Sequence, residues 1–176
     1  MTRKEFINSV AKRKTDIIQP LLDILAETGS RYCLIWGLAV NAYVEPVVSL
    51  DLDIVVTVQD VEATAKEARN WGLAVEQFKH SVKLSSDASE LRIPLHTDPR
   101  YQAFIADSEI RGVLGYKIKV VKLEDVLRGK TWAYMDKERR RSKRQKDLAD
   151  ILRIIEAHPE LKAALPQALR DEVERQ

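Results

Sequence analysis

Apolar residues recur at helical spacing over several stretches of the chain. One such stripe runs through residues 4–28, where Pro20 either kinks the helix or opens a second one after Thr15 and Asp16. Gly29 and Ser30 end this segment. A helix is also predicted from Asp60, a good N-cap residue, to about Trp71, before the stop signal of Gly72. Further helices are predicted over residues 38–44, 99–106, 123–135, 140–157 and 161–173.

Shorter apolar runs between turn residues predict strands. These runs are residues 32–36, 50–58, 74–78, 82–85, 91–95, 110–114 and 116–121. Pro94 indicates that its strand lies at a sheet edge or contains a bulge, and Gly115 indicates a hairpin between the last two strands. The order of these elements predicts an α/β (α+β) fold: a mixed β-sheet flanked by helices, with a C-terminal helical extension.

The length of 176 residues fits one domain, with a core at about residues 30–122 and C-terminal helices at about 123–176. A hydrophobic content of 45% with 32% charged residues is ordinary for a globular protein, and the net charge of +2 says little about partners. The single cysteine, Cys33, lies in an apolar strand and is expected to be a small buried hydrophobe in a reducing compartment.

No apolar run approaches the ~20 residues that span a bilayer, and the first residues lack a signal-peptide core. We therefore expect a cytoplasmic protein with no membrane partner.

Two carboxylates on one strand are the main chemical feature of the sequence. In Ser49-Leu-Asp-Leu-Asp-Ile-Val-Val56, Asp51 and Asp53 alternate with apolar residues, so they share one face of the strand, about 7 Å apart. Aspartate is depleted in strands, so two of them in an apolar run need a reason. Such a pair can bind Mg²⁺ together with substrate phosphates, which indicates metal-assisted nucleotidyl transfer. The alternative is a solvated strand face.

The turn before this strand has features of a phosphate site. Gly37 lets the backbone approach an anion at the start of a helix, or simply makes a tight turn. Ser49 either donates a hydrogen bond to a phosphate or caps a turn. Trp36 either narrows the phosphate pocket or packs beneath the sheet.

These two segments, residues 34–43 and 49–56, resemble the signature of the nucleotidyltransferase superfamily: a glycine turn, a helix, then Asp-x-Asp on the next strand. The later segments 123–130, 139–141 and 146–151 resemble the helical pattern of its minimal and AbiE-type members. The resemblance implies an NTP substrate such as ATP, a two-metal Mg²⁺ site at Asp51 and Asp53, and phosphate-side lysines at Lys130 and Lys146. The implied reaction transfers a nucleoside monophosphate to an acceptor hydroxyl on RNA, a protein or a small molecule. The resemblance also allows a toxin–antitoxin component with an antitoxin-like partner.

A third carboxylate is expected to complete such a site. Asp98, after the strand 91–95, is the candidate, although Asp98-Pro99 is also a common start of a turn. His96 either acts as a base near the metal or has a structural role.

A basic run spans Lys137 to Lys146, with seven basic residues in ten. It is either a solvated helix face or a rim that holds a triphosphate or another polyanion by charge. Asp147 and Asp150 lie three residues apart and are expected to form ion pairs within the helix, with Lys143 and Lys146.

Two other functions remain open from the sequence. Val47 and Val48 stand where the superfamily often has a basic residue, Trp36 and Leu38 flank the glycine, and the third acid is ambiguous. These departures favour a nucleotidyltransferase fold that has lost catalysis and serves as a binding or regulatory module. A nucleic-acid-binding protein acting through residues 137–146 is the third reading, and its affinity would fall with salt and ignore Mg²⁺.

Overall fold

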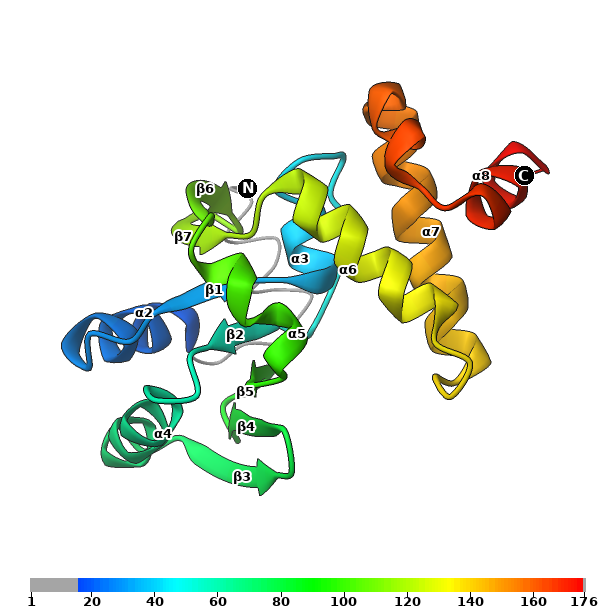
Figure 1. Cartoon of the computed structure of the whole chain (residues 1–176). Coiled ribbons are helices and arrows are strands. Elements are labelled where there is room, and N and C mark those ends of the chain that lie inside the picture. The colour runs from blue at the N-terminus through cyan, green and yellow to red at the C-terminus, as the bar shows by residue number, and fades with distance from the viewer. Residues whose placement is uncertain (1–15, 176) are drawn as a thin grey trace.

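A mixed β-sheet with helices on both sides forms the body of the protein (Figure 1). The computed structural model describes residues 16–175. The strands are β1 (Tyr32–Leu34), β2 (Ile54–Val56), β3 (Ala74–Phe78), β4 (Ser81–Ser86), β5 (Ser89–His96), β6 (Glu109–Val113) and β7 (Tyr116–Val120). The helices are α2 (Ile18–Glu27), α3 (Trp36–Val40), α4 (Val61–Asn70), α5 (Pro99–Gln102), α6 (Leu123–Met135), α7 (Arg141–Ala157) and α8 (Gln167–Arg175), with short 3₁₀ turns at Ala103–Ile105 and Pro159–Ala164.

The seven strands form one sheet in the order β3-β4-β5-β2-β1-β7-β6. β2 pairs in parallel with β5 and antiparallel with β1, and β1 pairs in parallel with β7. The two hairpin pairs, β3–β4 and β6–β7, and the β4–β5 pair are antiparallel. The predicted mixed sheet with flanking helices is therefore confirmed, and the strand carrying the carboxylates leads into its centre.

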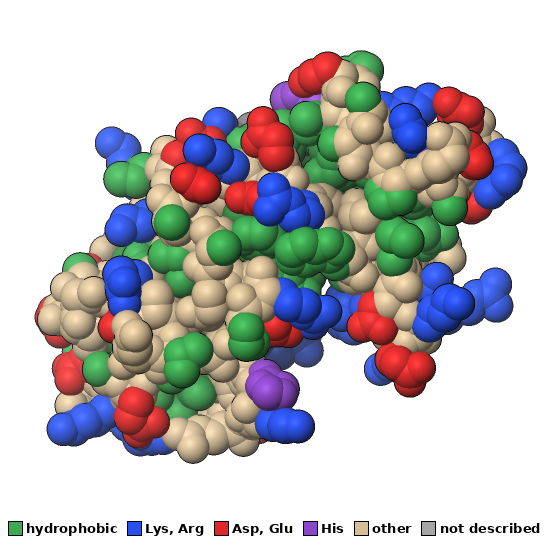
Figure 2. Space-filling view, viewed as in Figure 1, with side chains coloured by type: hydrophobic (Ala, Val, Ile, Leu, Met, Phe, Trp, Pro, Cys, Tyr) green, Lys and Arg blue, Asp and Glu red, His purple; other side chains and the backbone are tan. Residues whose placement is uncertain are grey.

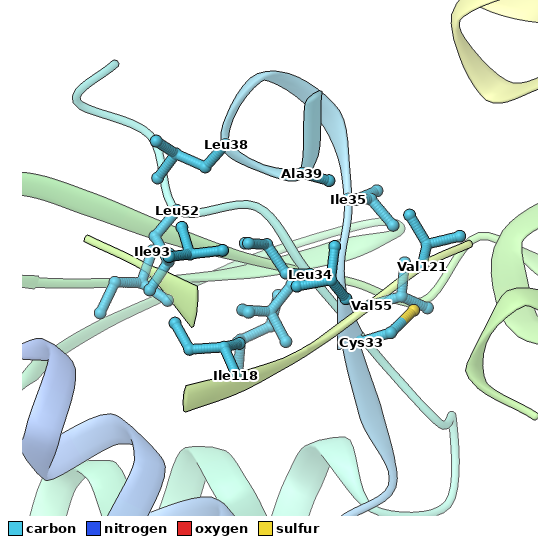
Figure 3. Close-up of a cluster of buried hydrophobic side chains, with 14 of the residues drawn as sticks. Cys33, Leu34, Ile35, Leu38, Ala39, Leu52, Val55, Ile93, Ile118 and Val121 are labelled. Carbon is cyan, nitrogen blue, oxygen red and sulfur yellow. The ribbon is translucent and has the colours of Figure 1, made fainter. Parts of the chain in front are cut away.

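Aliphatic side chains of the central strands make the core (Figure 3). Leu34 of β1, Ile93 of β5 and Ile118 of β7 are fully buried on the face of the sheet that lies beneath Leu38 of α3, whereas Val55 of β2 is buried on the opposite face together with Cys33. Burial of each such side chain stabilises the fold by about 1.5–3 kcal/mol relative to leaving it exposed. Cys33 lies in the same cluster, as expected, and burial raises the pKa of its thiol to about 12.

The helices divide between the two sides of the sheet. α2 and α4 lie together at one side, whereas α6, α7 and α8 lie at the other (Figure 1). α6 and α7 form an antiparallel helical hairpin, and α3 packs on both of them. Within residues 16–175, no helix is long and apolar enough to cross a membrane.

The predicted strand 50–58 is shorter than expected, and Pro94 explains why. Arg92 of β5 donates its N–H to the Leu50 carbonyl and accepts the N–H of Leu52, each at 2.9 Å. Two residues further on, Pro94 has no N–H to donate, so the ladder is interrupted before β2 begins at Ile54. Of the two alternatives for Pro94, the sheet edge was wrong, because β5 lies between β4 and β2, and the bulge was right, because the register of β5 against β4 shifts between Leu84 and Ser86.

Other boundaries also moved. The helix predicted over 38–44 begins at Trp36 and ends at Val40, and the one predicted over 161–173 is a 3₁₀ turn followed by α8, with the break at Pro166. α6 coincides with its predicted range. The helical stripe predicted over residues 4–28 is observed as α2, at residues 18–27. Just before this helix, Asp16 Oδ1 accepts the Ile18 N–H at 2.9 Å. Residues 4–15 of the predicted stripe lie outside the described part of the chain. Asp60 precedes α4 as predicted, but its carboxylate binds Arg31 and Thr57 rather than capping the helix.

Candidate functional site

A cleft of about 670 Å³ lies between the sheet and α7. Figure 2 shows the surface hollowed between the part that carries β3–β5 and the C-terminal helices, with Lys and Arg side chains gathered around the hollow. The cleft brings together all the residues that the sequence assigned to metal or phosphate binding. These residues are Gly37, Ser49, Asp51, Asp53, Asp98, Lys130 and Lys146. Their individual roles stay predictions.

Asp51 and Asp53 lie where the chain enters β2, on the sheet wall of the cleft. Asp51 Oδ1 pairs with Arg92 Nε at 2.8 Å, and Asp53 Oδ1 binds His96 Nε2 at 2.9 Å. Their side chains are 35% and 17% exposed, so both can be reached from the cleft.

The donor set suits Mg²⁺ that also binds a nucleotide. Mg²⁺ typically takes one or two protein carboxylates and fills its other positions with phosphate oxygens and water. Two neighbouring carboxylates meet that need. Within residues 16–175 no group of three or more His, Cys, Asp or Glu side chains is arranged to hold a metal, so substrate oxygens would have to complete the coordination.

In the turn that leads into α3, the strained backbone conformation is at Trp36 and not at Gly37. Trp36 has a φ of 61°, a conformation that costs a bulky residue about 1–3 kcal/mol. A Cβ placed on Gly37 would lie 3.8 Å from Ser49 Oγ, which is an ordinary contact. The fold therefore has room for a side chain at position 37, and a tight turn does not explain the glycine. An open backbone at the start of a helix, facing the cleft, is compatible with close approach of a ligand.

Ser49 has a local partner. Its Oγ accepts the Asp51 N–H and donates to the Asp51 carbonyl, each at 3.3 Å. Ser49 thus shapes the turn just before the carboxylates while facing the cleft, so the two sequence-based readings of this residue are compatible.

Trp36 lines the cleft instead of packing beneath the sheet. Its ring meets Tyr101 edge-on, with centroids 5.2 Å apart, and the cationic groups of Lys130 and Arg139 lie 5.3 and 5.8 Å from its centroid. Contacts of this type are worth about 0.5–2 kcal/mol each. The indole therefore holds the basic wall of the cleft against the α3 turn, and these contacts help to offset the strain in its backbone.

Asp98 is both a turn residue and a member of the cleft. It precedes α5, and its Oδ1 accepts the Arg100 N–H at 2.9 Å while the Arg100 guanidinium pairs with Oδ2 at 2.7 Å. These bonds to Arg100 lower the pKa of the Asp98 carboxyl below its usual value. Asp98 is thus held ionised, which suits a ligand of a cation better than a proton acceptor.

The lysines predicted to be phosphate-side residues have different surroundings. Lys130 of α6 is buried, with its side chain 6% exposed, and its Nζ lies 3.0 Å from Asp147 Oδ1 and 2.7 Å from Asp150 Oδ2. Lys146 of α7 is exposed on the cleft wall beside Lys143.

The prediction of ion pairs within α7 holds for Asp150, but the partners are not Lys143 and Lys146. Asp147 and Asp150 both pair with Lys130 of α6, because α7 packs against α6. Arg139 pairs with Asp147 Oδ2 at 2.8 Å, and Arg153 pairs with Asp150 Oδ1 at 2.8 Å. A network of three cations and two carboxylates, buried at Lys130 and Asp147 and partly exposed at Arg139 and Arg153, thus joins the two helices.

Six further residues of the cleft were not singled out from the sequence: His80, Ser81, Arg100, Tyr101, Ala149 and Arg153. His80 and Tyr101 carry no local signal. Arg100, two residues after Asp98, fits the pattern of a turn-starting aspartate with a nearby cation, which could have been noticed. Arg153 lies beyond the basic run, and only the packing of α7 brings it to the cleft.

Comparison with solved structures identifies the fold. The chain resembles the solution structure of the antibiotic-resistance factor ANT(2'')-Ia, with 13% identity and a TM-score of 0.58 over 90% of each chain. It also resembles the lincomycin-bound lincosamide adenylyltransferase LnuA, with 13% identity and a TM-score of 0.55 over 81% of this chain and 98% of that one. A nucleotidyltransferase-like protein from Paracoccidioides brasiliensis matches with 20% identity and a TM-score of 0.58, over 90% of this chain and 84% of that one.

No protein-family model and no curated protein matches the sequence. At identities of this size the likeness concerns architecture alone. The mixed seven-stranded sheet, its flanking helices and these structural neighbours together show that the chain has the nucleotidyltransferase-like α/β fold.

Proposed function

We propose that this protein is a metal-dependent nucleotidyltransferase, which transfers a nucleoside monophosphate from an NTP to an acceptor hydroxyl and releases pyrophosphate. The observation that carries the proposal is the cleft itself. It places two accessible carboxylates, an unhindered glycine and exposed lysines around one space, in a fold shared with the adenylyltransferase LnuA.

The residues of the chain divide the work of binding. Asp51 and Asp53 would hold Mg²⁺ together with phosphate oxygens, and the bound metal would neutralise charge and align the phosphates with the attacking oxygen. Gly37 leaves its backbone open to a phosphate, and Ser49 Oγ lies beside it. Lys143 and Lys146 add positive charge on the opposite wall, which favours a triphosphate.

Competition for the carboxylates is part of this proposal. Arg92 binds Oδ1 of Asp51, and His96 binds Oδ1 of Asp53. The Arg92 side chain is 55% exposed, so its ion pair is worth no more than about 1 kcal/mol and yields readily to a divalent cation.

Calorimetry of the four NTPs with and without Mg²⁺ tests the proposal. Wild type is expected to bind at least one NTP only with Mg²⁺, and the double variant Asp51→Asn, Asp53→Asn is expected to lose that binding and the release of pyrophosphate. A matched variant, Glu62→Gln with Asp87→Asn, removes two exposed acids away from the cleft and should bind as wild type does. Equal binding by wild type and the Asp51, Asp53 variant would refute the site.

A degenerate fold that serves as a binding or regulatory module is the second candidate. The observation that favours it is that the three acids near β2 are each already bound by a basic side chain, namely Arg92, His96 and Arg100. This candidate predicts nucleotide binding without pyrophosphate release, or no nucleotide binding by the folded protein.

The identity of the acceptor is a separate question. Structural neighbours include a complex with adenylyl-2''-tobramycin and one with lincomycin, and those ligands belong to those proteins. For this chain the acceptor is proposed only as a hydroxyl on RNA, a protein or a small molecule. ATP as donor, a toxin–antitoxin role with an antitoxin-like partner, and a cytoplasmic location stay predictions from the sequence.

A further inference from the structure

The segment between α3 and Asp51 lines the cleft without regular secondary structure. We call residues 41–49 the strap. Val47, Val48 and Ser49 of the strap face the cleft, and the chain passes from Ser49 directly to the two carboxylates. Val47 and Val48 are 51% and 59% exposed, so burial of these apolar side chains does little to fix the strap. Its first part is held by the core, because Ala42, Tyr43 and Val44 pack against it and the Tyr43 hydroxyl donates to the Val121 carbonyl at 2.7 Å. Other contacts must set the position of residues 45–49.

Asn41 closes the strap into a loop. Its side-chain Nδ2 donates to the Val47 carbonyl at 2.6 Å, and its Oδ1 accepts the Val47 N–H at 3.1 Å. This pair of bonds imitates the pairing of two strands and fixes the two ends of residues 41–47 relative to each other. Because Asn41 directly follows α3, these bonds place Val47 relative to α3 but not relative to α7.

Arg153 of α7 makes that connection. Its Nη2 donates to Asn41 Oδ1 at 3.0 Å and to the Glu45 carbonyl at 2.5 Å, across more than a hundred residues of sequence. Its Nη1 is held by Asp150 Oδ1 at 2.8 Å, and Asp150 Oδ2 is held in turn by Lys130. The guanidinium is therefore oriented by the network of α6 and α7 and reaches out to the strap. A planar group with several fixed donors on separate nitrogens suits this task better than the single nitrogen of a lysine.

We propose that Arg153 is a positioning residue, which fixes the strap against α7 and thereby sets where Ser49 and the Asp51–Asp53 pair lie in the cleft. The part of this inference that concerns nucleotide affinity rests on the proposed function. Arg153 acts through the strap and needs no contact with the reacting atoms. Because a displacement of about 1 Å in a catalytic group can reduce a rate about a hundredfold, losing this anchor should be felt at the site.

The test compares Arg153→Met with Arg144→Met in the full-length protein. Arg144 lies on the same helix and also donates to a backbone carbonyl, that of Tyr134, at 2.6 Å, but it does not line the cleft. Hydrogen exchange of the Val47 and Asp51 amides reports on the strap directly. We expect exchange to rise by about tenfold in Arg153→Met, with the β5 amides and the unfolding midpoint nearly unchanged, and no change in the Arg144 variant.

Nucleotide binding gives the second readout. Arg153→Met is expected to weaken Mg²⁺–NTP binding by about tenfold, Arg153→Lys to restore part of that loss, and Asn41→Ala to behave like Arg153→Met. Unchanged exchange at Val47 and Asp51 would overturn the inference, and so would faster exchange with unchanged NTP affinity. If wild type binds no NTP, the proposed function fails. The exchange result then decides the inference alone: loss of protection supports Arg153 as the anchor of the strap, and full protection refutes it.

Discussion

At the scale of single residues, Gly37 is a glycine that the fold itself does not require. Glycine inside a helix costs about 0.5–1 kcal/mol relative to alanine, and the space around position 37 accepts a Cβ. The positive φ at this turn belongs to Trp36 instead. A residue that destabilises the helix and is not required by the turn points to something outside the chain that comes close to its backbone.

We therefore expect Gly37→Ala to keep or slightly raise the free energy of unfolding, while weakening Mg²⁺–NTP binding by about tenfold, equivalent to ~1.4 kcal/mol. Urea unfolding and calorimetry measure the two effects. Gly112→Ala in β6 is the control, because a Cβ there meets nothing within 4 Å and Gly112 does not line the cleft. An alanine at position 37 that binds nucleotide as wild type does would contradict close phosphate approach.

Single residues also show what the sequence could and could not predict. Asp51 and Asp53 were found from local pattern, because alternation along a strand requires no knowledge of the rest of the fold. The left-handed conformation of Trp36 had no such signal, since a tryptophan is not expected there. The sequence indicated that Pro94 interrupts the hydrogen bonds of its strand. It did not indicate that this strand lies inside the sheet, where the interruption shortens the neighbouring strand β2.

At the scale of elements, the hairpin of α6 and α7 is joined by charges buried between its helices. The sequence predicted both helices, and even the bounds of α6, from spacing of apolar residues. It did not predict which charges pair. Lys130 and Asp147 are 17 residues apart, and their contact depends on how the two helices pack, which periodicity within either helix does not contain.

We therefore predict that Lys130 stabilises the folded protein in addition to lining the cleft. Lys130→Met leaves Asp147 and Asp150 without their shared buried cation, and removal of one partner from a buried ion pair costs about 3 kcal/mol or more. Urea unfolding of the variant measures this cost.

Two further variants interpret the result. Lys130→Met combined with Asp147→Asn and Asp150→Asn should recover part of the stability, since no carboxylate then remains buried and uncompensated, while Arg139 and Arg153 lose their carboxylate partners but are partly exposed to solvent. Lys146→Met, on the exposed side of α7, should change stability by less than about 0.5 kcal/mol. A loss below about 1 kcal/mol in Lys130→Met would mean that Arg139 and Arg153 alone can neutralise both acids.

At the scale of the whole molecule, the distribution of charge matters more than its sum. A net charge of +2 gave no indication of a partner. The fold turns one part of the basic run toward the cleft, at Arg139, Lys143 and Lys146, opposite the carboxylates of the sheet. The sequence predicted that these segments belong to one site only through a family resemblance, because Asp51 and Lys146 are far apart in the chain. That the whole chain is one domain, with its core at about 30–122, stays a prediction.

The arrangement of charge leads to a test that separates nucleotide transfer from nonspecific polyanion binding. Lys143 and Lys146 are exposed, so their attraction for a triphosphate is screened by salt, with a Debye length of about 8 Å at 0.15 M. We expect the affinity for Mg²⁺–NTP to fall as salt rises, and to fall less steeply in Lys143→Gln, Lys146→Gln. The matched variant Lys66→Gln, Lys117→Gln removes two exposed lysines that do not line the cleft and should keep the wild-type slope. Calorimetry with and without Mg²⁺ at several salt concentrations measures both slopes.

A different result would favour nucleic-acid binding. In that case a single-stranded RNA would bind more tightly than any NTP, its affinity would depend strongly on salt, and neither Mg²⁺ nor Asp51→Asn would change it. Such a result would identify residues 137–146 as a nucleic-acid surface and would remove the reason to assign catalysis to the carboxylates.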